Sequence, residues 1–300
     1  MNKPKFQSNL IQLFKNKGLQ ETTINNYIRN LELINDGKPF TNLSFLNDVS
    51  GIKEKLVKYK KTTIRNYYAS IVAVLSIMKS KKKLLNEYEK ILEYQQTEVE
   101  KSSSEKAETQ EDYPTVQEIK DISNELMNKD LTKYDNILNY MILSLYTKIQ
   151  PRRNKDYLEM KIVKRINKND SEKYNYFDVL NRVFIFNQYK TKKIYGKQVL
   201  DIPNELYEIL LKYLEVHPMK HRYDLDERIP LLLGNSINYI TRLLNKIFKR
   251  NVGSTILRHA FLTNKYEGGK VDNFSESIKD ANAMGHSITS QKLTYIKNLI

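Results

Sequence analysis

The sequence predicts a mainly α-helical protein with one small antiparallel β-sheet. Two observations favour helices: only 9 glycines and 7 prolines occur in 300 residues, and apolar side chains recur every three or four positions in several segments. A third observation indicates the sheet. Between residues 174 and 202 the helical period gives way to short runs of β-branched and aromatic residues.

The first hundred residues follow the helical period. Ile24, Ile28 and Leu31 share one face of a predicted helix, and the stretch 21–23 (Glu-Thr-Thr) supplies its N-cap. A second helix is expected to begin at Thr62 or Thr63, and a third to run from about residue 84 to residue 94. This half of the chain is therefore predicted to be a helical domain.

Residues 98–113 contain almost no apolar side chains and are rich in Glu, Lys and Ser. This composition predicts an exposed linker, which divides the chain into a first domain over residues 1–97 and a second over residues 114–300. Thr115 and Glu118 then form a capping-box pattern that predicts the start of a new helix. Another helix is expected between residues 130 and 148.

Three predicted strands interrupt the helices of the second domain. They cover residues 174–179, 183–187 and 197–202, with a turn at Asn181-Arg182 and another near Gly196. Their close spacing predicts an antiparallel arrangement. Helices are expected to resume after Pro203, and Ser236 is the predicted cap of one of them.

The charge balance points to a polyanionic partner. Lys and Arg exceed Asp and Glu by 50 to 35, a net charge of +15, which favours nucleic acid over other partners. The absence of cysteine excludes disulfides, zinc-thiolate sites and cysteine nucleophiles. The longest apolar stretch, near residues 137–146, is too short to span a bilayer, and the N-terminus lacks a signal-peptide core. An intracellular protein without a membrane partner is expected.

The last part of the chain contains the residues that could catalyse a reaction. It contains Leu-Arg-His at 257–259, Met-Gly-His-Ser at 284–287, and Tyr295 nine positions after His286. Arginine and histidine donate hydrogen bonds to phosphate oxygens, and a tyrosine hydroxyl in that cationic setting can attack the phosphorus atom. The order of these residues therefore predicts attack on a phosphodiester.

With these motifs, the sequence resembles the tyrosine recombinase (phage integrase) family over nearly its whole length. The first domain resembles the family's core-binding domain, with Phe6 and Leu10 on a first helix followed by the stretch 18–27. The resemblance implies a helical, SAM-like core-binding domain over 1–97. It also implies a mixed α/β catalytic domain over 114–300.

The resemblance implies a first catalytic arginine at Arg153, with an acidic partner at Asp156 three positions later. Arg152 is one position away and is the alternative register. The family's hairpin lysine corresponds to Lys190, in a Lys-Thr pair, with Lys192 and Lys193 as alternatives in the same turn.

The second catalytic arginine corresponds to Arg258, in a position where the family has His-x-x-Arg. Here the leading histidine is replaced by Thr255, whose hydroxyl can bond a phosphate but cannot do acid–base work near neutral pH. His259 is expected to pack rather than to react. His286 corresponds to the family's second histidine and Tyr295 to its nucleophile.

The implied activity is site-specific recombination. Tyr295 would form a 3′-phosphotyrosyl bond, with Lys190 protonating the leaving 5′ oxygen and with no metal or other cofactor. The implied partners are double-stranded DNA and three further protomers in a DNA-bound tetramer. The purpose would be integration or excision of a mobile element or viral genome. The location would follow the DNA: a bacterial cytoplasm or nucleoid, a host nucleus, or a virus factory.

Two alternatives remain open at the level of sequence. A type IB topoisomerase uses a similar residue set, and a DNA-binding protein with a decayed site would explain Thr255. Lys60, Lys61 and Arg65 are candidate phosphate contacts in the first domain. His217 and His221 have metal-like spacing, but Pro218 lies between them, and both are expected at the surface.

Overall fold

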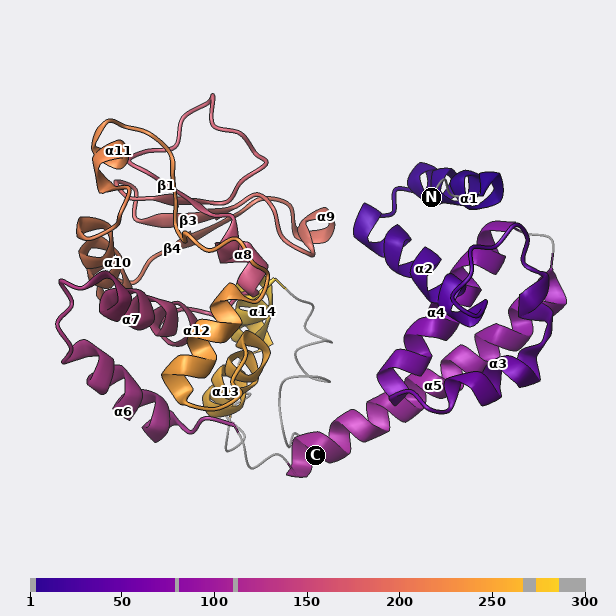
Figure 1. Cartoon of the computed structure of the whole chain (residues 1–300). Coiled ribbons are helices and arrows are strands. Elements are labelled where there is room, and N and C mark those ends of the chain that lie inside the picture. The colour runs from indigo at the N-terminus through magenta and orange to yellow at the C-terminus, as the bar shows by residue number, and fades with distance from the viewer. Residues whose placement is uncertain (1–3, 79–80, 110–112, 267–273, 286–300) are drawn as a thin grey trace. The chain divides into compact units, whose positions relative to one another are not determined.

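The computed structural model describes residues 4–78, 81–109, 113–266 and 274–285. The chain divides into two compact units, Met1–Thr109 and Gln110–Ile300 (Figure 1). Over its described residues the first unit is entirely helical, and the second combines helices with one small sheet. The predicted fold class, mainly helical with a small sheet, is confirmed.

Helix α4 is the centre of the first unit. Helices α1, α2 and α5 all pack against it, and its side chains Ile71 and Val74 are completely buried. The Tyr88 hydroxyl on α5 donates to the Leu46 carbonyl at 2.8 Å and so ties α5 to the α2–α3 connection. The elements are α1 (Lys5–Asn16), α2 (Glu21–Ile34), the 3-10 helix η1 (Ser44–Asn47), α3 (Val49–Leu56), α4 (Lys61–Met78) and α5 (Lys82–Thr109).

Helix α5 is longer than the sequence predicts. The expected third helix ends near Tyr94, whereas α5 continues to Thr109 and so occupies most of the predicted linker over 98–113. The lack of apolar residues there does not prevent a helix. Glu, Lys and Ala are strong helix formers, and a helix that is polar all round can bridge two domains.

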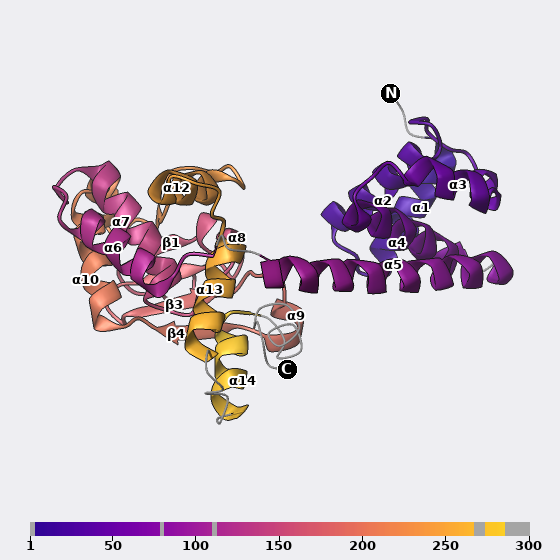
Figure 2. The same cartoon turned by 90° about the horizontal axis from the view of Figure 1, so that it is seen from below.

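Helix α7 is the centre of the second unit. It is buried on nearly all sides, because α6, α10, α12 and α13 pack around it. Figure 2 shows α10 on the side of α7 away from α13 and α14. The helices of this unit are α6 (Val116–Met127), α7 (Tyr134–Thr147), α8 (Asn154–Leu158), α9 (Lys192–Tyr195), α10 (Asn204–Glu215), α11 (Lys220–Asp224), α12 (Tyr239–Phe248), α13 (Ser254–Tyr266) and α14 (Phe274–Ala283).

The sheet of the described residues has the strand order β4-β3-β2-β1-β5. Strands β2, β3 and β4 form the predicted antiparallel meander, with Phe177 opposite Phe184 and Phe184 opposite Leu200. Two further strands, β1 and β5, extend it; β1 runs parallel to β2, so the sheet is mixed rather than purely antiparallel. The strands are β1 (Lys161–Val163), β2 (Tyr176–Asp178), β3 (Val183–Phe186), β4 (Gln198–Asp201) and β5 (Ile229–Pro230).

The predicted helix caps are partly confirmed. The Thr115 hydroxyl accepts from the Glu118 N–H at 3.1 Å, as the capping-box pattern predicts. The caps predicted at residues 21–23 and at Ser236 are wrong: Gln20 precedes α2, Asn238 precedes α12, and neither caps through its side chain. In both helices the apolar face, rather than the polar residue before it, fixes where the helix begins.

Candidate active site

Three arginine side chains meet at the C-terminal end of α14. Arg152 and Arg153 lie directly before α8, and Arg258 lies on α13. All three donate to backbone carbonyls of residues 283–285, the last residue of α14 and the two that follow it. In Figure 1 and Figure 2, α8 lies beside α13 and α14. The fold thus brings together the two arginine positions that the sequence predicts.

Each arginine takes a different carbonyl. Arg152 Nη1 donates to Ala283 O at 2.6 Å, Arg153 Nη1 to Gly285 O at 2.8 Å and Arg258 Nη2 to Met284 O at 3.3 Å. The last carbonyls of a helix lack partners within the helix and carry partial negative charge. A helix terminus is therefore what holds these guanidinium groups together.

The cluster is buried and has excess positive charge. Arg152 and Arg258 are 0% and 2% exposed, and Asp156 is 1% exposed. Asp156 accepts from Arg152 Nε at 3.0 Å. Burial raises the pKa of Asp156, and the charges of Arg152, Arg153 and Arg258 oppose that rise. With Asp156 ionised, the formal charge of these four groups alone is 3 − 1 = +2.

Lys190 is exposed and directly precedes Thr191, which contacts the same backbone segment as the arginine cluster. It occupies the turn between β3 and α9. The neighbouring Thr191 hydroxyl donates to Gly285 O at 2.7 Å, the same oxygen that Arg153 contacts. The turn that carries Lys190 is therefore fastened to the arginine cluster. Of the alternatives, Lys192 is half-buried and Lys193 is exposed, both on α9.

Thr255 is exposed on the first turn of α13, one turn before the buried Arg258. His259 is half-buried, and its ring lies 5.4 Å from that of Tyr113, centroid to centroid. The expectation that His259 packs is confirmed. A threonine at this exposed position can donate a hydrogen bond to an approaching phosphate, but it has no acid–base role near neutral pH.

The predicted residues His286, Ser287 and Tyr295 lie outside the described residues. The description ends at Gly285, which has a φ of +65°. Its N–H donates to Asn282 O at 2.9 Å, so the glycine turns the chain at the end of α14. The arginine cluster therefore surrounds the residue that directly precedes the predicted histidine.

The structure adds two residues that sequence reasoning missed. Gln198 on β4 accepts from Arg152 Nη1 at 2.7 Å and donates to Asn282 O at 2.8 Å. The Tyr189 ring lies 4.8 Å from the Arg152 guanidinium, and its hydroxyl donates to Gly196 O at 2.7 Å. Gln198 gives no sequence signal, whereas Tyr189 stands directly before the Lys-Thr pair.

His217 is buried, so its expected surface position is wrong. It is 2% exposed, its Nδ1 accepts from the Met219 N–H at 3.1 Å, and its ring packs against Tyr213 and Tyr134. Burial lowers its pKa to about 4, against an opposing effect of the Pro230 carbonyl. His217 falls three to four positions after Tyr213 and Leu214 and so continues the apolar face of α10. His221 is exposed as expected.

The candidate DNA contacts of the first unit lie at the N-terminus of α4. Lys60 is exposed directly before the helix. Lys61 pairs with Glu98 at 2.9 Å, and its side chain is 53% exposed. Arg65 donates to Gln96 at 3.1 Å and to Asn66 at 2.8 Å. Lys60 and Lys61 are therefore exposed, Arg65 is half-buried, and the last two hold polar partners on α5 or α4.

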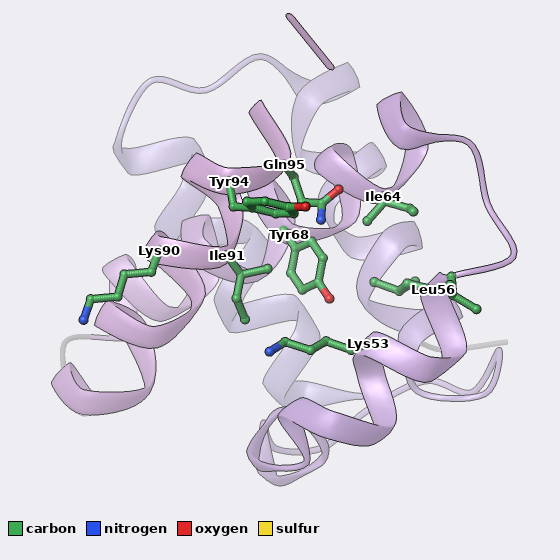
Figure 3. Close-up of a pocket in the computed structure, with 9 residues that line it drawn as sticks. Lys53, Leu56, Ile64, Tyr68, Lys90, Ile91, Tyr94 and Gln95 are labelled. Carbon is green, nitrogen blue, oxygen red and sulfur yellow. The ribbon is translucent and has the colours of Figure 1, made fainter. Parts of the chain in front are cut away.

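A separate pocket of about 480 Å³ opens in the first unit among α3, α4 and α5. Its lining is mostly apolar, with Lys53 and Lys90 at its edges, and the Tyr68 hydroxyl points to the Lys53 side (Figure 3). None of the predicted site residues lines it. It is therefore distinct from the candidate active site.

The described residues show neither a candidate metal site nor a candidate membrane span. They contain no group of three or more His, Asp or Glu side chains placed to hold a metal ion. No helix among them is long and apolar enough to cross a membrane.

No family model and no curated protein matches this chain. Among solved structures, the chain is similar to a crystal structure of XerA recombinase. The two are 15% identical, and the alignment covers 98% of this chain and 94% of that chain with a TM-score of 0.41. A TM-score of this size does not establish a common fold.

Proposed function

We propose that this protein is a tyrosine-type, site-specific DNA recombinase. It cuts and rejoins double-stranded DNA through a 3′-phosphotyrosyl intermediate in the integration or excision of a mobile element or viral genome. The observation that carries the proposal is the cluster of Arg152, Arg153 and Arg258, in which the first and last are buried and all three donate to backbone carbonyls at the end of α14.

The cluster suits a phosphodiester because a carbonyl oxygen and a non-bridging phosphate oxygen accept the same guanidinium hydrogen bonds. The phosphate also brings negative charge, which grows in the pentacoordinate transition state. Arg153 is half-buried, and one of its nitrogens contacts Gly285 O. Exchange of that oxygen for a phosphate oxygen would place an anion against the Arg153 guanidinium.

The remaining roles follow from residue chemistry. Tyr295 gives its hydroxyl proton to water as its oxygen attacks the phosphorus atom; the bond from phosphorus to the 5′ oxygen breaks, and that oxygen leaves with a proton from Lys190. His286 donates to a non-bridging oxygen. The phosphotyrosyl bond keeps the energy of the broken phosphodiester, so rejoining needs no nucleotide cofactor. Four protomers on two duplexes would exchange strands.

The test is covalent trapping. A pool of nicked suicide duplexes that tile the DNA flanking the coding sequence is incubated with the full-length protein, and DNA–protein adducts are resolved on denaturing gels. The wild type is expected to form an adduct and Tyr295→Phe to form none. An adduct that persists in Tyr295→Phe, or no adduct with any duplex, contradicts the proposal.

The same assay separates the alternatives. Relaxation of supercoiled plasmid by a protein that stays monomeric on DNA would indicate a type IB topoisomerase. DNA binding without any adduct would indicate a decayed site, the reading that Thr255 favours. Thr255→His is informative here: a faster variant shows that the missing histidine limits the chemistry, and an inactive one shows that the site has adapted to threonine.

A further inference from the structure

Arg152 differs from its half-buried neighbour Arg153 in burial and in its contacts with aromatic rings. It is 0% exposed and ranks among the largest fully buried side chains of the described residues. Its guanidinium lies 3.8 Å from the centroid of the Phe186 ring and 4.8 Å from that of Tyr189. A cation held between two rings and sealed from solvent is not placed to receive a DNA phosphate directly.

The polar contacts of Arg152 join three separate parts of the second unit. Nε donates to Asp156 on α8 at 3.0 Å, and Nη1 donates both to Gln198 on β4 at 2.7 Å and to the Ala283 carbonyl at the end of α14 at 2.6 Å. Gln198 in turn donates to the Asn282 carbonyl at 2.8 Å. Arg152 and Gln198 thus hold two successive carbonyls of the turn that leads to Gly285.

Besides these hydrogen bonds, Arg152 makes a close packing contact with Gly285. Arg152 Nη2 is buried and has no hydrogen-bond partner among the described residues. A methyl group on Gly285 would lie 3.2 Å from that nitrogen and 3.3 Å from Tyr189 Cδ2. The guanidinium therefore packs directly against the backbone of Gly285 and fixes its position as well as that of Ala283.

We propose that Arg152 is a positioning residue for strand cleavage, a role that rests on the proposed recombinase function. It sets the place of Gly285 relative to Arg153 and the Lys190 turn. Arg153 is the phosphate-contacting arginine of the pair. This assignment decides between the two registers that the sequence leaves open.

The experiment compares three full-length variants with the wild type. Arg152→Lys keeps the charge beside buried Asp156 but loses the planar, forked contacts. Gln198→Leu removes the second half of the clamp without changing a charge. Arg182→Lys is the matched control, because Arg182 is exposed and lies 4.6 Å from the Tyr207 ring centroid, away from the cluster.

Two readouts are used. The first is single-turnover cleavage at saturating concentrations of a nicked duplex that the wild type cleaves, together with the Kd for that duplex. Arg152→Lys is expected to slow cleavage on the order of 10²-fold, the effect of misplacing a catalytic group by about 1 Å, with the Kd unchanged. Gln198→Leu is expected to act in the same direction with a smaller effect, and Arg182→Lys to match the wild type.

The second readout needs no DNA. Hydrogen exchange of the Met284 and Gly285 amides, which donate to Asp280 and Asn282, is expected to accelerate in Arg152→Lys and Gln198→Leu. Wild-type cleavage and wild-type exchange in Arg152→Lys would overturn the proposal, as would a loss confined to Kd. If the wild type cleaves no duplex, the proposed recombinase function is wrong. In that case the hydrogen-exchange rates still test the positioning role of Arg152, and unchanged rates in both variants would overturn it.

Discussion

The two groups of basic residues in this protein contrast in their surroundings. In the second unit, Arg152 and Arg258 are almost completely buried and their hydrogen bonds have fixed directions. In the first unit, Lys60 is exposed and the Lys61 side chain is 53% exposed. Buried cations hold an anion in one geometry, whereas exposed cations contribute salt-dependent attraction to any phosphate backbone. The first group is suited to chemistry and the second to affinity.

The largest effect is expected when an arginine of the cluster in the second unit is replaced. Arg153→Ala is expected to slow single-turnover DNA cleavage by on the order of 10²- to 10³-fold, about 3–4 kcal/mol of transition-state stabilisation. Binding of the same duplex should change little. Lys155→Ala, an exposed position on α8, is the control. Equal losses in the two variants would show that charge near α8 matters rather than the geometry of Arg153.

The burial of His217 should make the stability of the second unit depend on pH, because its protonated form is disfavoured in the folded protein. Its folded-state pKa is about 4 against 6.5 in an unfolded chain, so the unfolded state binds the proton more readily. The free energy of unfolding should therefore fall by about 3 kcal/mol as the pH falls from about 6.5 to 4. Urea denaturation at several pH values measures it.

The control variants for this pH dependence are His217→Asn and His221→Asn. In His217→Asn, the amide oxygen can accept from the Met219 N–H in place of Nδ1, and this part of the pH dependence should disappear. His221→Asn should retain it, since His221 is exposed. An unchanged profile in His217→Asn would assign the acid sensitivity to other groups.

Gly285 tests how tightly the arginine cluster is packed. Gly285→Ala places a side chain at a φ of +65° and within 3.2 Å of Arg152 Nη2, so it should destabilise the fold by about 1–2 kcal/mol from backbone conformation alone. Gly37→Ala is the matched control, because Gly37 also has a positive φ, +74°, but nothing lies within 4 Å of its Cβ position. Urea denaturation that shows the same stability for both variants would mean that the cluster is loosely packed.

The smallest effect is expected for the basic residues at the N-terminus of α4. Replacing Lys60, Lys61 and Arg65 together by Gln should weaken binding to all duplexes similarly. If all three contact phosphates, the slope of log K against log salt concentration should decrease in magnitude by about 2 to 3. Cleavage at saturating DNA should not change. A change in cleavage with an unchanged salt slope would reverse the roles assigned to the two groups of cations.

Much of the fold could be predicted because its signals are local. The apolar spacing in α2 and α4, the capping pair at Thr115 and the β-rich runs after residue 174 each depend on a few neighbouring residues. Strands β1 and β5 could not be predicted, since three-residue and two-residue strands show no periodicity. The length of α5 was also missed, because a polar helix and an exposed linker have similar compositions.

The residues of the candidate site also fall into two sets, those that local sequence motifs predict and those that they do not. Arg153, Asp156 and Arg258 could be predicted from short motifs, and the structure brings them together with Gly285. Gln198 could not, since its role depends on β4 reaching the end of α14, a contact between segments 84 positions apart. Sequence spacing also could not separate Arg152 from Arg153. Their burial differs because of what packs around α8, which no local pattern records.

The central claim is that this protein forms a covalent bond to DNA through Tyr295. The most direct measurement is mass spectrometry of the trapped adduct after digestion of both protein and DNA. The account predicts one modified peptide, with a 3′-phosphonucleotide on the Tyr295 oxygen and with none on the other 20 of the 21 tyrosines. A phosphonucleotide on any other residue, or one linked through its 5′ phosphate, would contradict it.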